Sequence, residues 1–185
     1  MQYIKLGLYT LSIIVLVYCT VFLSADYQTL AGRNHMPFII WAIDTINLFI
    51  HEAGHLIFKI FGKTIYFMGG SLFQVILPAV TAFVFARTNL RSLLFTLYWT
   101  GQNMVNVSIY IADAPFQRLH LISGGAIHDW HWIMINCNLM DDIDTIASII
   151  NGLGILTCIA GIGLGLFFFV YDGYKLFRNP QLFSL

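Results

Sequence analysis

Residues 37–61 read PFIIWAIDTINLFIHEAGHLIFKIF, an almost uninterrupted apolar run that carries two histidines and a glutamate in its second half. The run is longer than the ~20 apolar residues that a helix needs to cross a bilayer. Glu52 is the only glutamate in the chain. A carboxylate at the centre of a membrane span costs roughly 2.5–3.5 kcal/mol even on a lenient insertion scale. A chain that uses glutamate once, at such a position, is expected to need it for chemistry.

The segment His51-Glu52-Ala53-Gly54-His55 has the H-E-x-x-H pattern of zinc hydrolases. Positions i and i+4 share one face of a helix, so His51 and His55 can bind the same metal ion. A zinc ion there lowers the pKa of a water molecule towards about 7, and Glu52 is placed to act as the general base. The alternative is that the three side chains merely pair inside a helical bundle. Each is penalised in an apolar span, which favours the zinc interpretation.

The composition is that of a membrane protein. Of 185 residues, 58% are hydrophobic and only 10% are charged, whereas a soluble domain carries about 25% charged residues. We expect a single integral membrane domain over residues 1–185, all-α, with about five transmembrane helices at residues 6–23, 37–61, 72–85, 92–112 and 146–171. These apolar stretches make the lipid bilayer an expected partner. The formal net charge is zero and no basic run occurs, so nucleic acid is not expected to be a partner. The expected location is multi-pass, in a bacterial cell membrane.

One segment departs from the helical pattern. Residues 64–70 read TIYFMGG, a β-branched and aromatic run that ends in a glycine pair. Such a run after the second span predicts a short strand or a re-entrant segment.

A catalytic zinc usually has a third protein ligand. The two spans after the H-E-x-x-H helix form a return trip, so the loop that follows them emerges on the same side as the end of that helix. This loop contains His128, Asp129 and His131. Asp129 would complete a set of two histidines and a carboxylate, and His128 is the nearest alternative. His131 and Asp113 are further candidates. The competing interpretation is an interfacial belt of tryptophan and histidine.

Span 92–112 carries a polar stripe. Asn103, Asn106, Tyr110 and Asp113 follow helical spacing and share one face. Asn103 or Asn106 could hold a substrate backbone or support the oxyanion of the transition state. Hydrogen bonding between helices explains the stripe equally well.

The H-E-x-x-H motif inside a span, followed by Gly69-Gly70 after a predicted short strand, resembles the site-2-protease class of intramembrane zinc metalloproteases. The resemblance covers roughly residues 39–85. It implies that His51 and His55 are zinc ligands and that Glu52 is the general base. It also implies that the segment ending at Gly69 and Gly70 holds an extended substrate, which would be a membrane-embedded helix or peptide of another protein.

The chain departs from that family in its third ligand, which the family takes from an Asp-Gly motif in a later span. Here Asp172-Gly173 falls at the far end of the last span, on the opposite side from His51. We therefore expect the third ligand to come from the loop around Asp129. The leading hypothesis is a zinc-dependent metalloprotease that hydrolyses peptide bonds of membrane-embedded substrates. The alternatives are a non-proteolytic metal-dependent membrane hydrolase and a catalytically silent membrane scaffold.

Overall fold

The computed structural model describes residues 2–25, 36–119 and 127–178. The middle of the loop that was expected to approach the metal site, residues 120–126, lies outside this part of the chain. The described residues form six α-helices and no strand: α1 (Gln2–Ala25), α2 (Phe38–Phe58), α3 (Lys63–Thr88), α4 (Leu93–Ala112), α5 (Asp129–Asn136) and α6 (Ile143–Arg178). Three 3₁₀ turns occupy Lys59–Phe61, Leu90–Ser92 and Met140–Asp142. The prediction of an all-α fold is confirmed.

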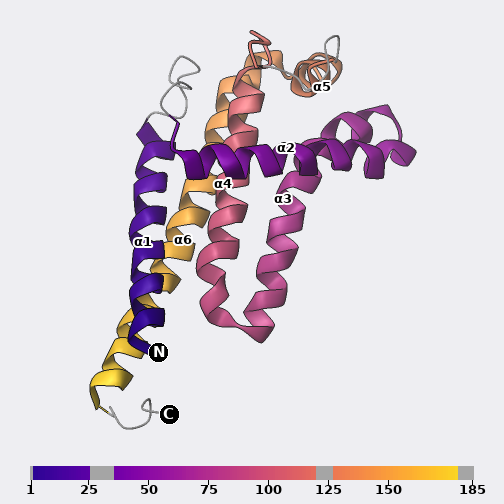
Figure 1. Ribbon diagram of the computed structural model, residues 1–185. Coiled ribbons are helices and arrows are strands. Elements are labelled where there is room, and N and C mark those ends of the chain that lie inside the picture. The colour runs from indigo at the N-terminus through magenta and orange to yellow at the C-terminus, as the bar shows by residue number, and fades with distance from the viewer. Residues whose placement is uncertain (1, 26–35, 120–126, 179–185) are drawn as a thin grey trace.

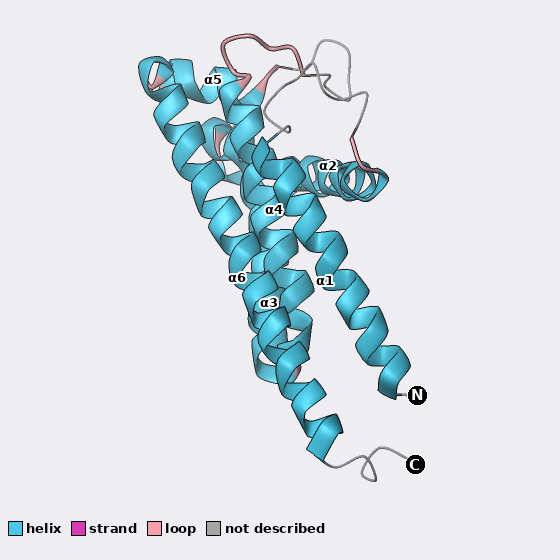
Figure 2. Ribbon diagram, turned by 90° about the vertical axis from the view of Figure 1, so that its left-hand side faces the viewer, coloured by secondary structure: helices cyan, strands magenta, loops and turns pink. Residues whose placement is uncertain are grey.

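Helices α1, α3, α4 and α6 run along a common direction, and α2 crosses them (Figure 1). When the molecule is turned by a right angle, α2 is seen nearly end-on while α1, α3, α4 and α6 remain aligned (Figure 2). The most extensive helix contact joins α4 to α6, and α4 also contacts α3 and α1. The short α5 packs against α3 and α4. The chain therefore builds a helical bundle with one transverse helix.

The number of helices able to cross a membrane is lower than expected. Among the described residues, three segments are long and apolar enough: Leu6–Ser24, Lys63–Thr88 and Met140–Arg178, in α1, α3 and α6. The stretches expected to form the second and fourth spans are helical, as α2 and α4, but they do not meet this criterion. The prediction of five spans is therefore wrong in its count. Both α2 and α4 carry many polar side chains, which lower the mean hydropathy of each helix.

The transverse helix α2 is tied to α4 by buried amides. Trp99 Nε1 donates to Asn47 Oδ1 at 2.9 Å, and Asn47 Nδ2 donates to Gln102 Oε1 at 2.7 Å. Gln102 Nε2 in turn donates to Asp44 Oδ1. Asn47 and Gln102 are almost completely buried. Unpaired polar groups are costly in such an interior, so these bonds hold α2 across α4.

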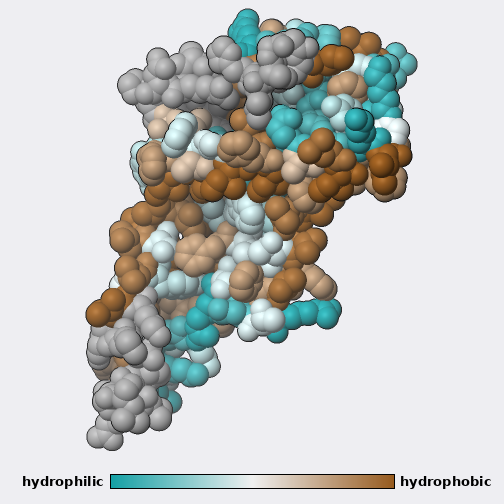
Figure 3. All heavy atoms as spheres, turned by 45° about the vertical axis from the view of Figure 1, so that its right-hand side comes forward, coloured by the Kyte–Doolittle hydropathy of each residue, from teal (hydrophilic) through white to brown (hydrophobic). Residues whose placement is uncertain are grey.

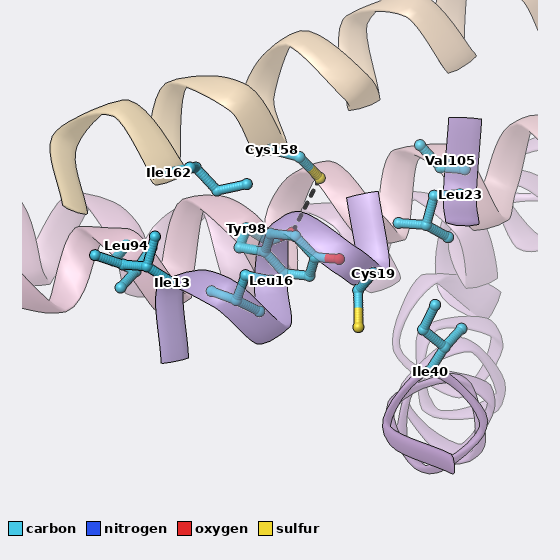
Figure 4. Packing of buried hydrophobic residues seen from close by; sticks show 10 residues of the cluster. All are labelled: Ile13, Leu16, Cys19, Leu23, Ile40, Leu94, Tyr98, Val105, Cys158 and Ile162. Carbon is cyan, nitrogen blue, oxygen red and sulfur yellow. Dashed lines mark hydrogen bonds between the residues drawn. The ribbon is translucent and has the colours of Figure 1, made fainter. Parts of the chain in front are cut away.

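The main apolar core lies between α1, α4 and α6 (Figure 4). It contains Ile13, Leu16, Cys19, Leu23, Ile40, Leu94, Tyr98, Val105, Cys158 and Ile162. Ile40 is the contribution of α2 to this cluster. At the crossing of α4 and α6, a Cβ on Gly101 would lie 2.5 Å from the carbonyl oxygen of Gly154. The two backbones can approach so closely because both positions lack a side chain.

The turn between α2 and α3 depends on Gly62, whose φ of +95° favours glycine. The chain reverses there, and residues 64–70 form the first turns of α3. The prediction of a short strand is therefore wrong, and the alternative of a re-entrant segment stays a prediction. A Cβ on Gly69 would lie 2.6 Å from Phe58 Cβ and 3.0 Å from the carbonyl oxygen of Gly54. Close packing of α3 on α2 overrides the local strand preference of this segment.

The surface shows a division by polarity. In Figure 3, hydrophobic residues gather in the middle of the molecule, with hydrophilic residues towards both ends of the visible face. Many large apolar side chains are exposed on α1, α3 and α6, including Leu8, Phe83 and Phe167. Exposed apolar surface on long apolar helices is consistent with a membrane protein.

Candidate metal centre

Three side chains that are far apart in the sequence meet at one point. His51 and His55 lie one turn apart on α2, and Asp129 is the first residue of α5. Asp129 Oδ2 lies 3.0 Å from His51 Nε2 and 3.2 Å from His55 Nε2. All three side chains are buried, and their candidate ligand atoms lie within 4.8 Å of one another. The structure thus brings the predicted histidine pair together with the predicted carboxylate.

The far side of each imidazole is held by a hydrogen-bond acceptor. His55 Nδ1 lies 2.8 Å from the backbone carbonyl oxygen of Tyr66, and His51 Nδ1 lies 3.1 Å from Gln74 Oε1. A carbonyl oxygen only accepts, so each Nδ1 must carry the hydrogen. In the neutral rings, the Nε2 lone pairs then point at Asp129. This is the arrangement in which histidine binds metals, because the outer hydrogen bond fixes the tautomer and the ring orientation.

The charge balance at this point favours a cation. Burial raises the pKa of Asp129, but hydrogen bonds from His51 and His55, which require their Nε2 atoms to be protonated, outweigh burial and lower this pKa. Two Nε2 lone pairs and an ionised carboxylate oxygen repel one another unless protons or a metal ion lie between them. Ligand atoms about 2.0–2.1 Å from a tetrahedral zinc ion are themselves about 3.3 Å apart. The two separations from Asp129 Oδ2, 3.0 and 3.2 Å, are close to this spacing.

The residues that were weighed against Asp129 as third ligand lie elsewhere. His128 Nδ1 accepts the backbone N–H of His131 and caps α5. His128 Nε2 faces Asp113 Oδ2 at 3.4 Å, and burial lowers the pKa of His128 despite this carboxylate. His131 Nδ1 lies 2.8 Å from the carbonyl oxygen of Ala114. His128, His131 and Asp113 thus fasten the start of α5 to the end of α4, and none joins the cluster of His51, His55 and Asp129.

Glu52 sits beside this cluster but is exposed. It is close enough to interact electrostatically with His55 and Tyr110. The sequence predicted this carboxylate within a membrane span, but α2 does not meet the criterion for a span, and its Glu52 side chain faces outward. Its exposed neighbours one turn away on α2, Phe49 and Leu56, are apolar. Exposure places this carboxylate on the surface of the protein, beside the cluster of His51, His55 and Asp129.

The two glycines that were expected to hold substrate instead contact α2. Gly69 packs against Phe58 and Gly54, and Gly70 packs against the ring of His51. A Cβ on Gly70 would lie only 2.5 Å from His51 Nε2. Both glycines are buried within a regular helix. Gly70 therefore makes room for a candidate metal ligand.

The two asparagines of α4 differ in their surroundings. Asn106 Oδ1 accepts a hydrogen bond from Gln74 Nε2 at 2.8 Å, which links it through Gln74 to His51. Asn103 donates to the carbonyl oxygen of Trp99, and its Oδ1 is buried with no hydrogen-bond partner among the described residues.

Gln74, which contacts both Asn106 and His51, was not predicted from the sequence. Its position four residues after Gly70, on the same face of α3, is the signal that could have revealed it.

The Asp-Gly pair at residues 172–173 lies away from the cluster. Asp172 forms an ion pair with Arg91, in which Arg91 Nη2 lies 2.6 Å from Asp172 Oδ1. Arg91 lies in the turn between α3 and α4. Figure 1 shows this turn at the opposite end of the bundle from α5. Asp172 therefore pairs with Arg91 and not with His51, His55 or Asp129.

Comparison with known proteins adds no relative from which a role could be transferred. No protein-family model matches the chain, and neither a curated protein nor a solved structure shows significant similarity to it.

Proposed function

We propose that this protein is a membrane-bound zinc peptidase, in which His51, His55 and Asp129 hold the metal ion and Glu52 is the general base. The observation that carries the proposal is the convergence of two imidazole Nε2 atoms on one carboxylate oxygen, with an exposed carboxylate in the next position of the same helix. A bound zinc ion would polarise a water molecule and the substrate carbonyl.

The residues of the chain supply the rest of the chemistry. Tyr66 and Gln74 hold the histidines in the tautomer that leaves Nε2 free. Glu52 accepts a proton from the attacking water and returns it to the leaving amine. Zinc is favoured over magnesium or calcium because the donor set has two imidazole nitrogens, whereas those hard cations select oxygen ligands.

We also propose that α1, α3 and α6 cross a bilayer and that α4 is enclosed among them. Their length and apolarity support this. Twelve of the residues of α4 are buried, many of them polar, so this helix hides its polar side chains from lipid. Substrates would then be peptide segments of membrane proteins, because the surface of α2 next to Glu52 exposes Phe49 and Leu56.

The test compares Glu52→Gln with the parent protein on two probes in detergent: fluorescently labelled casein and a synthetic transmembrane peptide. Glu52→Gln keeps the shape of the side chain but removes the base, so zinc content should stay and hydrolysis should fall by at least ~100-fold. Asp144→Asn, at an exposed acidic position at the start of α6, is the matched control and should keep full activity.

Full peptidase activity in Glu52→Gln would refute the general-base assignment. Zinc-dependent hydrolysis of phospholipid esters, with neither peptide probe cleaved, would replace the peptidase proposal with a metal-dependent lipid hydrolase.

A further inference from the structure

Tyr110 contacts the candidate metal centre through Asp129, at both the side chain and the backbone of that residue. Its hydroxyl oxygen lies 3.1 Å from Asp129 Oδ2 and 3.2 Å from the backbone nitrogen of Asp129. The oxygen Oδ2 is the same atom that faces both histidines. Tyr110 belongs to the last turns of α4, so these bonds connect the bundle to the first residue of α5.

The direction of both hydrogen bonds follows from the chemistry of the groups. A backbone N–H only donates, so the Tyr110 oxygen accepts from Asp129 N. Its own hydrogen is then free to be donated to the ionised carboxylate, which only accepts. The hydroxyl thus bridges the backbone and the side chain of Asp129 and limits rotation of the carboxylate.

The ring of Tyr110 is itself held between the rings of His51 and His128. It meets His51 edge-to-face, with ring centroids 5.6 Å apart, and lies against His128 at 4.3 Å. The hydroxyl therefore has a fixed position relative to α2 and α5. A fixed donor at this place can set where Oδ2 points.

We propose that Tyr110 is a positioning residue for the metal centre: its hydroxyl orients Asp129 Oδ2 towards His51 and His55 and thereby sets the affinity and the ligand geometry of the bound metal. This inference rests on the proposed function. When a metal-binding carboxylate loses the side chain that hydrogen-bonds it, metal affinity typically falls by about 10–100-fold. Packing alone does not require the hydroxyl, because the ring contacts survive in phenylalanine.

The test measures Zn²⁺ affinity of Tyr110→Phe in detergent by competition with a chromophoric chelator. The control is Tyr98→Phe, which removes the hydroxyl of another buried tyrosine of α4 about 18 Å away along the helix. We expect affinity to fall at least ~10-fold in Tyr110→Phe and to change less than ~3-fold in the control. Tyr110→Met, which also lacks the hydroxyl, gives the same readout if Tyr110→Phe does not fold.

The second readout is the visible absorption spectrum of the Co²⁺-loaded protein at saturating cobalt. A displaced carboxylate changes the ligand field, so the bands should shift in Tyr110→Phe and stay unchanged in Tyr98→Phe. Unchanged affinity in Tyr110→Phe overturns the proposal, and so does an affinity loss with an unchanged cobalt spectrum. A parent protein that binds neither Zn²⁺ nor Co²⁺ refutes the proposed function itself, which is a distinct result.

Discussion

Gly70 offers the sharpest test of how the two crossing helices shape the candidate metal centre. The glycine lies on α3 where that helix passes over the ring of His51. A Cβ at this position would be 2.5 Å from His51 Nε2 and 2.7 Å from both Cδ2 and Cε1. The substitution Gly70→Ala therefore places a methyl group against the atom that is proposed to bind zinc.

The size of the disturbance follows from these distances. Ordinary van der Waals contact begins at 3.4 Å, so the His51 ring must retreat by about 0.9 Å, or α3 must move away from α2. Metal–ligand distances tolerate about 0.2 Å. If the His51 ring is displaced by several times that tolerance, its hydrogen bond to Gln74 is also strained. We expect at least ~10-fold weaker zinc binding and about 1–3 kcal/mol lower stability of the metal-free protein from overpacking.

The assay is zinc competition with a chromophoric chelator, together with thermal unfolding in chelator. Gly163→Ala is the matched control, because it makes the same change in α6 at a position where a Cβ meets nothing within 4 Å. It should leave zinc affinity unchanged and stabilise the helix by up to ~1 kcal/mol. A Gly70→Ala protein that binds zinc within about threefold of the parent would refute the argument that α3 constrains His51.

Three further substitutions test other parts of the account. Asp129→Asn should weaken zinc binding by at least ~10-fold in the chelator competition, because an amide oxygen is a poorer ligand than a carboxylate; unchanged affinity would remove Asp129 as third ligand. His128→Ala should lower stability by about 1 kcal/mol in thermal unfolding, since the cap of α5 is lost; a melting temperature equal to the parent's would count against the fastening role. Asn47→Ala leaves the Trp99 N–H unpaired and should cost about 1–3 kcal/mol by the same measurement; a cost below ~0.5 kcal/mol would mean that this network does not anchor α2.

The helical character and the positions of the long helices follow from apolar content, which a sequence displays directly. The course of α2 does not, because mean hydropathy averages over all faces of a helix. Asp44, Asn47, His51 and His55 lie along one face of α2, and the first two find partners in α4. That polar face gives α2 a transverse position in contact with α4. The gathering of polar residues on one face of residues 37–61 is the signal in the sequence against a second membrane span.

The short segment after Gly62 shows how tertiary packing overrides local preference. Residues 64–70 have β-branched and aromatic side chains, which favour a strand. Helix contacts at Gly54, Gly69 and Gly70 instead bring α3 against α2. Spacing in the sequence cannot show which backbone a glycine faces.

Two features of the candidate site were predictable from the sequence: the pairing of two histidines on one helix, and the side of the bundle on which the third ligand lies. The i, i+4 spacing placed His51 and His55 together, and the return of α3 and α4 brought Asp129 to the same side. The partners of the histidines were not predictable. Gln74 and the carbonyl oxygen of Tyr66 reach them only because α3 crosses α2 at a specific point.

The metal content of the purified protein tests the central claim most directly. Protein purified in detergent without chelators is analysed by inductively coupled plasma mass spectrometry, beside a His51→Ala variant prepared in the same way. The account predicts about one zinc ion per chain in the parent protein and almost none in His51→Ala. A parent protein without bound metal, or a His51→Ala protein with the same zinc content as the parent, would contradict it.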